Sequence, residues 1–112
     1  METIKKYYIP IKSLNGGKEN NLKVEVYYDL GGYSYFTGKQ TKRGYYVSVL
    51  PVERSQKENC IVESLTLFVG YKHCLKEVTR KTNKASQEAI SLSENIDWLI
   101  KEVCDKYNLE LL

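Results

Sequence analysis

Alternation of apolar and polar residues marks the first part of the chain as β-structure. The clearest stretch is 22–29 (LKVEVYYD), in which every even-numbered residue is apolar and most odd-numbered ones are charged. Successive side chains of a strand point to opposite faces, so this period of two predicts a strand with one buried face. A second stretch, 44–52, is rich in Tyr and Val. The two stretches most simply form a long hairpin, whose connection, 30–43, contains three glycines.

Three further segments complete the predicted sheet. The segment Ile4–Ile11 reads as a strand, and Pro10 near its end favours an edge position because proline cannot donate to a neighbouring strand. After a polar, turn-like stretch at 53–59, the run Cys60–Val69 reads as another strand. Residues 73–80 fit a strand or a helix, and we favour a strand. All strands therefore fall within roughly 4–80.

The C-terminal part has the rhythm of a helix. From about residue 84, apolar residues recur at spacings of four and three, namely Ala85, Ala89, Leu92, Ile96, Leu99, Val103 and Tyr107. Thr82 or Asn83 can cap the start of this helix, and Asn108 can take a left-handed conformation at its end. The predicted fold is therefore α+β: a four- to five-stranded antiparallel sheet followed by one long C-terminal amphipathic helix, roughly 83–107, packed on one face.

Size and charge narrow the class of protein. With 112 residues, 42% hydrophobic and 28% charged, the chain predicts a single domain over 1–112. Its 17 Lys and Arg against 14 Asp and Glu give a net charge of +3, which suits an anionic partner without requiring one. No apolar run is long enough for a signal sequence or a membrane span, so we expect a cytoplasmic protein that does not engage a membrane.

The residues offer little chemistry for catalysis. His73 is adjacent to Cys74, but neighbours in a strand point to opposite faces and could not share a proton. The three cysteines have spacings that match neither a disulfide framework nor a zinc site, and we expect Cys60, Cys74 and Cys104 to be reduced, buried thiols. The carboxylates are scattered, and the glycine pairs lack the spacing of a phosphate loop. We therefore expect no enzyme, no cofactor and no metal.

The hairpin connection contains more aromatic and basic residues than a turn requires. Aromatic rings interleaved with cations are typical of single-stranded nucleic acid binding, and equally of protein interfaces. The same tyrosines could instead only form cross-strand pairs that cover the sheet edge. A second basic cluster precedes the helix, where positive charge opposes the helix dipole. The candidate partner-binding residues are Tyr33, Tyr35, Phe36, Lys39, Lys42 and Arg43 in the connection, and Arg80, Lys81 and Lys84 before the helix.

The segment GGYSYFTGKQTKRGYYVSVLPVER (31–54), followed by an apolar strand and by RKTNKASQEA (80–89), resembles small uncharacterised proteins encoded on phages and conjugative elements of Gram-positive bacteria. The resemblance transfers no functional residue. It implies a non-enzymatic binding protein that disables a host defence nuclease, in the manner of anti-CRISPR proteins. The partner would then be a host protein or ribonucleoprotein complex in the bacterial cytoplasm. The alternative is a nucleic-acid-binding accessory protein that uses the aromatic and basic connection.

Overall fold

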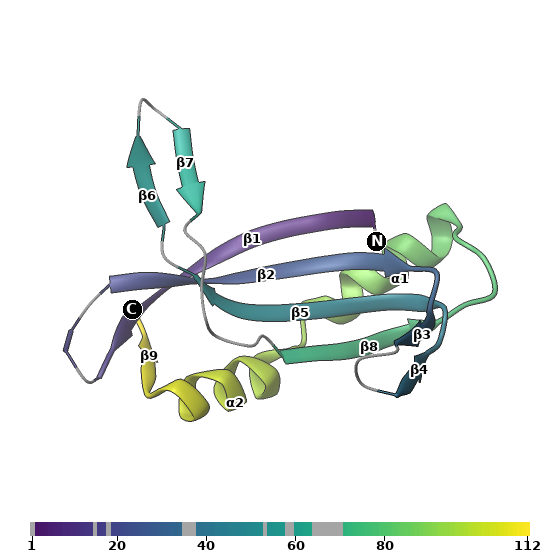
Figure 1. Cartoon of the computed structure of the whole chain (residues 1–112). Helices are drawn as coiled ribbons and strands as arrows, with labels where there is room; N and C mark the ends of the chain where they lie inside the picture. Colours follow the sequence, from purple (N-terminus) through teal and green to yellow (C-terminus); the bar gives the residue numbers. More distant parts are fainter. Residues whose placement is uncertain are drawn as a thin grey trace.

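We analysed a computed structural model, which describes residues 2–14, 16–17, 19–34, 38–52, 54–57, 60–63 and 71–112. Five antiparallel strands form the main sheet in the order β8-β5-β2-β1-β9: β1 Glu2–Ser13, β2 Glu19–Asp29, β5 Gly44–Val52, β8 Tyr71–Glu77 and β9 Leu109–Leu111. Two small hairpins extend from the sheet: β3 Gly32–Ser34 with β4 Lys39–Thr41, and β6 Arg54–Lys57 with β7 Cys60–Glu63. The helices are α1 Asn83–Ser93 and α2 Asp97–Tyr107. Figure 1 shows the curved sheet with its helices.

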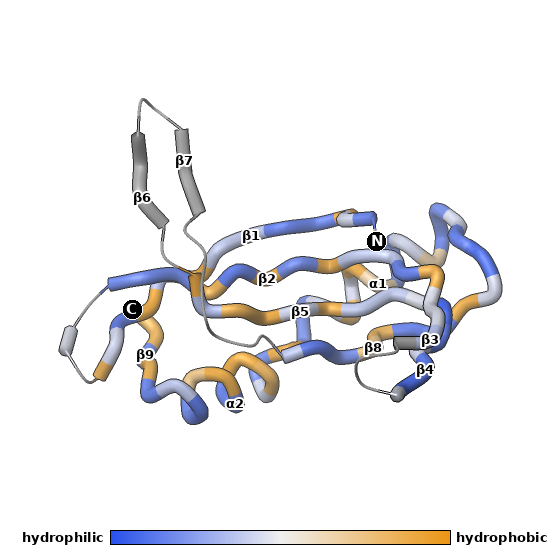
Figure 2. Tube along the Cα trace, in the orientation of Figure 1, coloured by the Kyte–Doolittle hydropathy of each residue, from blue (hydrophilic) through white to orange (hydrophobic). Residues whose placement is uncertain are grey.

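The predicted pairing of the two most regular segments is confirmed. β2 and β5 run antiparallel, with Val26 opposite Val47 and Tyr28 opposite Tyr45. The alternating apolar residues of both strands form one buried face, and the apolar residues of α2 pack against it. Figure 2 shows the polar and apolar positions alternating along β2. Burial of these side chains is the main force that holds α2 on the sheet.

The prediction of one long helix was wrong, because residues 94–96 separate α1 from α2. The amide groups of the first two of these residues bond to carbonyls three residues back, both at 3.2 Å, which tightens the chain into a turn. The buried Ser93 hydroxyl donates to the Ile90 carbonyl at 2.6 Å. Ser and Asn compete for backbone hydrogen bonds in this way and weaken a helix interior. The turn also leaves Leu92, expected in the buried stripe, 47% exposed.

The strand predictions need three corrections. The fifth strand of the main sheet is β9, which the sequence analysis did not predict, and it covers the end of β1, so that β1 lies at the sheet edge over only part of its length. The segment predicted as Cys60–Val69 is a strand over β7 and pairs with β6 outside the main sheet; residues 64–70 lie outside the described part. The turn-like stretch at 53–59 contains β6. The favoured strand at 73–80 is confirmed as β8, which ends at Glu77.

The four neighbouring tyrosines of β2 and β5 form cross-strand pairs. Tyr28 and Tyr45 lie on the helix side, with ring centroids 5.3 Å apart. On the opposite side Tyr27 and Tyr46 stack at 5.8 Å, and the Lys72 ammonium lies over both rings. Burial is the main cause that raises the pKa of Tyr27. These four tyrosines, which lie outside the connection at 30–43, therefore have a structural explanation in pair packing.

Candidate anion-binding surface

The sheet brings the two basic clusters of the sequence to one place. β5 begins at Gly44, and Gly44 lies opposite Glu77 at the end of β8. The chain just before β5 and the chain just after β8 therefore run side by side, and the Val78 amide donates to the Arg43 carbonyl at 3.2 Å. We call this region the basic end: Lys39, Lys42, Arg43, Arg80, Lys81 and Lys84.

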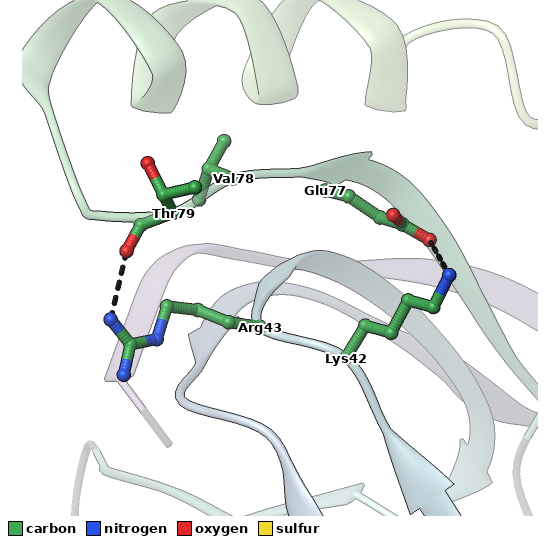
Figure 3. Close-up of a pocket in the computed structure, with 5 residues that line it drawn as sticks. All are labelled: Lys42, Arg43, Glu77, Val78 and Thr79. Atoms are coloured by element: carbon green, nitrogen blue, oxygen red, sulfur yellow. Dashed lines mark hydrogen bonds and ion pairs between the residues drawn. The ribbon is translucent and has the colours of Figure 1, made fainter.

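A cavity of about 350 Å³ lies between these two chain segments, and the basic-end residues that line it are Lys42 and Arg43 (Figure 3). Its lining includes Lys42 and Arg43 on one side and residues 77–79 on the other. The Arg43 guanidinium crosses the cavity and donates to the Thr79 carbonyl at 2.8 Å. This bond fixes one side of the guanidinium and leaves its other N–H groups available to a ligand, because Arg carries five donors. Arg43 thus links the two chain segments and is also a candidate anion contact.

Close backbone approach between β5 and β8 depends on a glycine. A Cβ at Gly44 would lie 2.5 Å from the Lys76 carbonyl oxygen, a distance that real side chains do not tolerate. Glycine here allows β8 to follow β5 to its first residue. The position of Arg43 beside Thr79 follows from that pairing.

Two lysines of the basic end form ion pairs with nearby carboxylates. The Lys42 ammonium lies 3.6 Å from Glu77, and the Lys42 side chain is 74% exposed. Lys81 pairs with Glu2 at the start of β1. Exposed pairs of this kind contribute little to stability, because water screens both charges. Each lysine can therefore exchange its carboxylate for a phosphate at small cost.

The start of α1 is fixed to the sheet behind the basic end. The Tyr45 hydroxyl is 2.7 Å from the Ser86 hydroxyl and donates to the Thr82 carbonyl at 3.3 Å. The Thr82 hydroxyl accepts the Ala85 amide at 3.1 Å, so Thr82, one of the two predicted caps, is the N-cap. The predicted C-terminal conformation is also confirmed, because Asn108 has φ 55 and ψ 55. The first turn of α1 contains no acidic residue, so no carboxylate there offsets the exposed Lys84.

A third helix–sheet contact, Lys76 of β8 with Glu88 of α1, lies next to this region. The hydrogen bond from Lys76 is the main cause that lowers the pKa of Glu88. Lys76 is therefore neutralised within the fold. It is a structural cation and not part of the basic end.

The aromatic candidates have unequal outcomes. Tyr33 lies in β3 opposite Gln40 and is 58% exposed. Its neighbour in the chain, Ser34, pairs with Lys39 of β4. Tyr35 and Phe36 lie outside the described residues. The β3–β4 hairpin leaves the sheet at Gly31, whose amide donates to the Asp29 carboxylate at 2.8 Å. One aromatic ring is thus placed in reach of solvent beside the basic end.

Residues 77–79 are the functional candidates that the sequence analysis missed. Nothing in their composition marks a site, since Glu77 contributes a carboxylate and Thr79 a backbone carbonyl. Their role follows only from the pairing of β5 with β8. The strand prediction at 73–80 was the signal that the sequence offered, and it did not reveal the register with β5.

His73 and Cys74 lie on opposite faces of β8, as predicted. The His73 ring meets the Trp98 ring of α2 edge-on at 4.8 Å, whereas Cys74 lies beside Tyr46 on the other face. Of the predicted buried thiols, Cys104 is buried and Cys74 is half-buried, and both are free. The side chain of Cys60 lies outside the described part.

Among the described residues, no group of three or more His, Cys, Asp or Glu side chains could hold a metal ion. Neither α1 nor α2 has the length and apolar character that a membrane span needs, within the same residues. No protein-family model, curated protein or solved structure matches the chain.

Proposed function

We propose that this is a non-enzymatic binding protein whose basic end contacts the phosphates of a single-stranded nucleic acid. The observation that carries the proposal is that β5 and β8 bring two basic clusters, distant in sequence, side by side, and that Lys42 and Arg43 line a cavity of about 350 Å³ there. Exposed Lys42 and Lys84 supply charge, and Arg43 supplies a positioned guanidinium. Arg and Lys contacts to phosphate dominate the affinity of such complexes.

The exposed ring of Tyr33 favours a single-stranded nucleic acid as the ligand over a duplex. A half-exposed ring beside cations can stack on an unpaired base, and stacking of this kind tolerates any base. A duplex offers its bases only within the grooves, where a ring on a short hairpin gains little. Recognition would then be tolerant of sequence.

The non-enzymatic part of the proposal rests on the separation of His73 from Cys74. The two side chains point to opposite faces of β8, and His73 packs on Trp98. A nucleophile and its base must lie within hydrogen-bond reach of each other. Replacing both by Ala should leave nucleic acid binding unchanged.

Fluorescence anisotropy with labelled oligo(dT) and oligo(U) of about 12 nucleotides tests the proposal. We expect binding at about 20 mM salt that weakens by an order of magnitude or more at about 200 mM, because phosphate contacts release counterions. The Tyr33→Ala variant should weaken binding to the single strand by about fivefold or more and leave binding to a duplex of equal length unchanged. Absence of binding at low salt contradicts the proposal.

A second candidate is the inhibitor of a bacterial defence nuclease that the resemblance implies. Exposed Leu92 and Trp98, both 47% exposed near the turn between the helices, favour a protein partner. A nuclease that carries a guide RNA presents both a protein surface and phosphates, in the cytoplasm of a bacterial host. The candidate predicts that the protein co-purifies with such a complex and blocks its cleavage. Pull-downs from a defence-bearing host that recover nothing specific would exclude it.

A further inference from the structure

The outer edge of β1 is covered over only its last residues. β9 pairs with Ile11–Ser13, and the Leu112 amide then donates to the Pro10 carbonyl at 3.2 Å. Within the described residues, no strand continues this pairing along residues 2–9, although β2 pairs with them on the other side. The edge therefore already pairs with one strand and keeps an outer side that no described strand uses, which is the geometry of strand addition.

A second cavity opens where β9 stops. It has a volume of about 310 Å³ and lies between β1, α2 and β9. Its apolar lining comes from Ile9, Ile100, Cys104 and Leu111, and Asp97 and Lys101 complete it. Ile100 and Cys104 are buried, whereas Leu111 is exposed. The cavity is large enough for one or two apolar side chains.

The lysines of β1 indicate which charge a strand added at the outer edge of β1 should carry. Lys6 faces Glu25 of β2, and Lys12 faces Glu19 of β2 and Glu110 of β9. Each neighbouring strand thus places a glutamate opposite a β1 lysine, a favourable cross-strand pair. A strand added beside Lys6 would gain the same pairing from an acidic residue.

We propose that the β1 edge binds an extended, acidic-apolar peptide segment of a partner protein. The segment runs antiparallel to β1 and continues the line of β9. It places an apolar residue opposite Ile9, directed into the cavity, a second opposite Tyr7, and an acidic residue opposite Lys6. This site is separate from the basic end and does not depend on the proposed nucleic acid binding.

A second copy of the chain fits this edge poorly. If two β1 edges paired antiparallel over residues 2–9, the register with the longest overlap would set Lys5 of each copy opposite Lys6 of the other. Like charges directly opposite each other destabilise a strand pair. The same lysines attract an acidic peptide.

The test is a titration of the ¹⁵N-labelled protein with the peptide Ac-Val-Thr-Val-Glu-Thr-Thr-NH₂, followed by amide chemical shifts. We expect shifts confined to β1, α2 and β9, with the largest near Ile9 and Cys104. The peptide Ac-Thr-Val-Thr-Glu-Thr-Val-NH₂ has the same composition and the same Glu position, but both of its valines face the side away from the cavity. It should bind at least fivefold more weakly.

Exchanging the charges of Lys6 and of the peptide glutamate tests the register in which the peptide pairs with β1. The Lys6→Glu variant should weaken binding of the first peptide at least fivefold, and a peptide with Lys in place of Glu should restore it. Arg80→Glu at the basic end, which changes the charge by the same amount at an exposed position away from β1, should bind normally. Equal binding of the two valine patterns, shifts elsewhere, or no effect of Lys6→Glu would overturn the proposal. Concentration-dependent shifts along β1 without peptide would also overturn it, since the occupant would then be a second copy.

Discussion

Gly31 occupies a backbone conformation that other residues adopt only with strain. Its φ is +77, and a Cβ at this position would lie 2.4 Å from the Thr41 carbonyl oxygen. The residue sits where the chain leaves β2 to form the β3–β4 hairpin. Glycine is therefore required for the hairpin to fold back beside the basic end.

Replacement of Gly31 by Ala tests this requirement. We expect Gly31→Ala to lower the free energy of unfolding by about 2 kcal/mol, because it adds both φ strain and a steric clash. Urea denaturation measures the change. Gly16→Ala, where no atom lies within 4 Å of the new Cβ, should change stability by less than about 0.5 kcal/mol. Equal effects at the two glycines would refute the argument.

The Lys76–Glu88 pair makes stability depend on acid. Because the pKa of Glu88 is lower in the folded protein, the unfolded chain binds its proton first as the pH falls. The stabilisation is present above the usual carboxyl pKa, 4.5, and is lost as the pH falls through the lower folded value. Wild type should therefore lose more stability than Glu88→Gln between about pH 5 and 3.

Thermal unfolding at several pH values measures this difference. Glu102→Gln on α2, which removes one carboxylate at an exposed position, controls for the general effect of charge. A Glu88→Gln variant with the same pH profile as wild type would show that the pair contributes nothing in solution.

At the scale of elements, the N-cap of α1 is a point where side-chain chemistry sets a boundary. The sequence left Thr82 and Asn83 as alternatives, and the hydrogen bond to Ala85 identifies Thr82. Thr82→Ala should therefore lower the free energy of unfolding by about 1 kcal/mol. Asn83→Ala, at an exposed position, should have less than half this effect. The reverse order in urea denaturation would assign the cap to Asn83.

The helices and strands also show which elements could be predicted from sequence patterns and which could not. The period of two in 22–29 predicted β2 and its partner β5, because one buried face leaves a strong alternation. The division between α1 and α2 was hidden, since apolar spacing continues through Ile96, which is buried although it lies outside both helices. β9 was missed because three residues are too few to show a period.

The candidate site was predictable in its residues but not in its assembly. Lys42, Arg43 and Lys81 were identified by charge alone. Their common location depends on the register of β5 with β8, which a sequence does not reveal when β8 is short and carries mixed side chains. The ion pairs of Lys42 with Glu77 and of Lys81 with Glu2 could not be predicted for the same reason.

At the scale of the whole molecule, helix packing and the proposed partner-binding surface occupy different parts of the sheet. The apolar face of β2 and β5 is used by α2 and explains the core. The basic end lies where β5 begins and β8 ends, and its residues belong to β4, to the connections and to the first turn of α1. Lys42, Arg80 and Lys84 are exposed there, and exposed positive charge attracts an anionic partner.

The central claim is that the two basic clusters form one surface, and the salt dependence of oligonucleotide binding tests it most directly. Anisotropy titrations with oligo(dT) would compare wild type with Lys39→Gln/Lys42→Gln and with Arg80→Gln/Lys84→Gln. Each pair should reduce the slope of log K against log salt by about 1.4, which is about 0.7 for each lost phosphate contact. Lys101→Gln/Lys106→Gln on α2 should leave the slope unchanged. If only one of the two basic-end pairs changes the slope, the clusters do not act as one surface and the account is wrong.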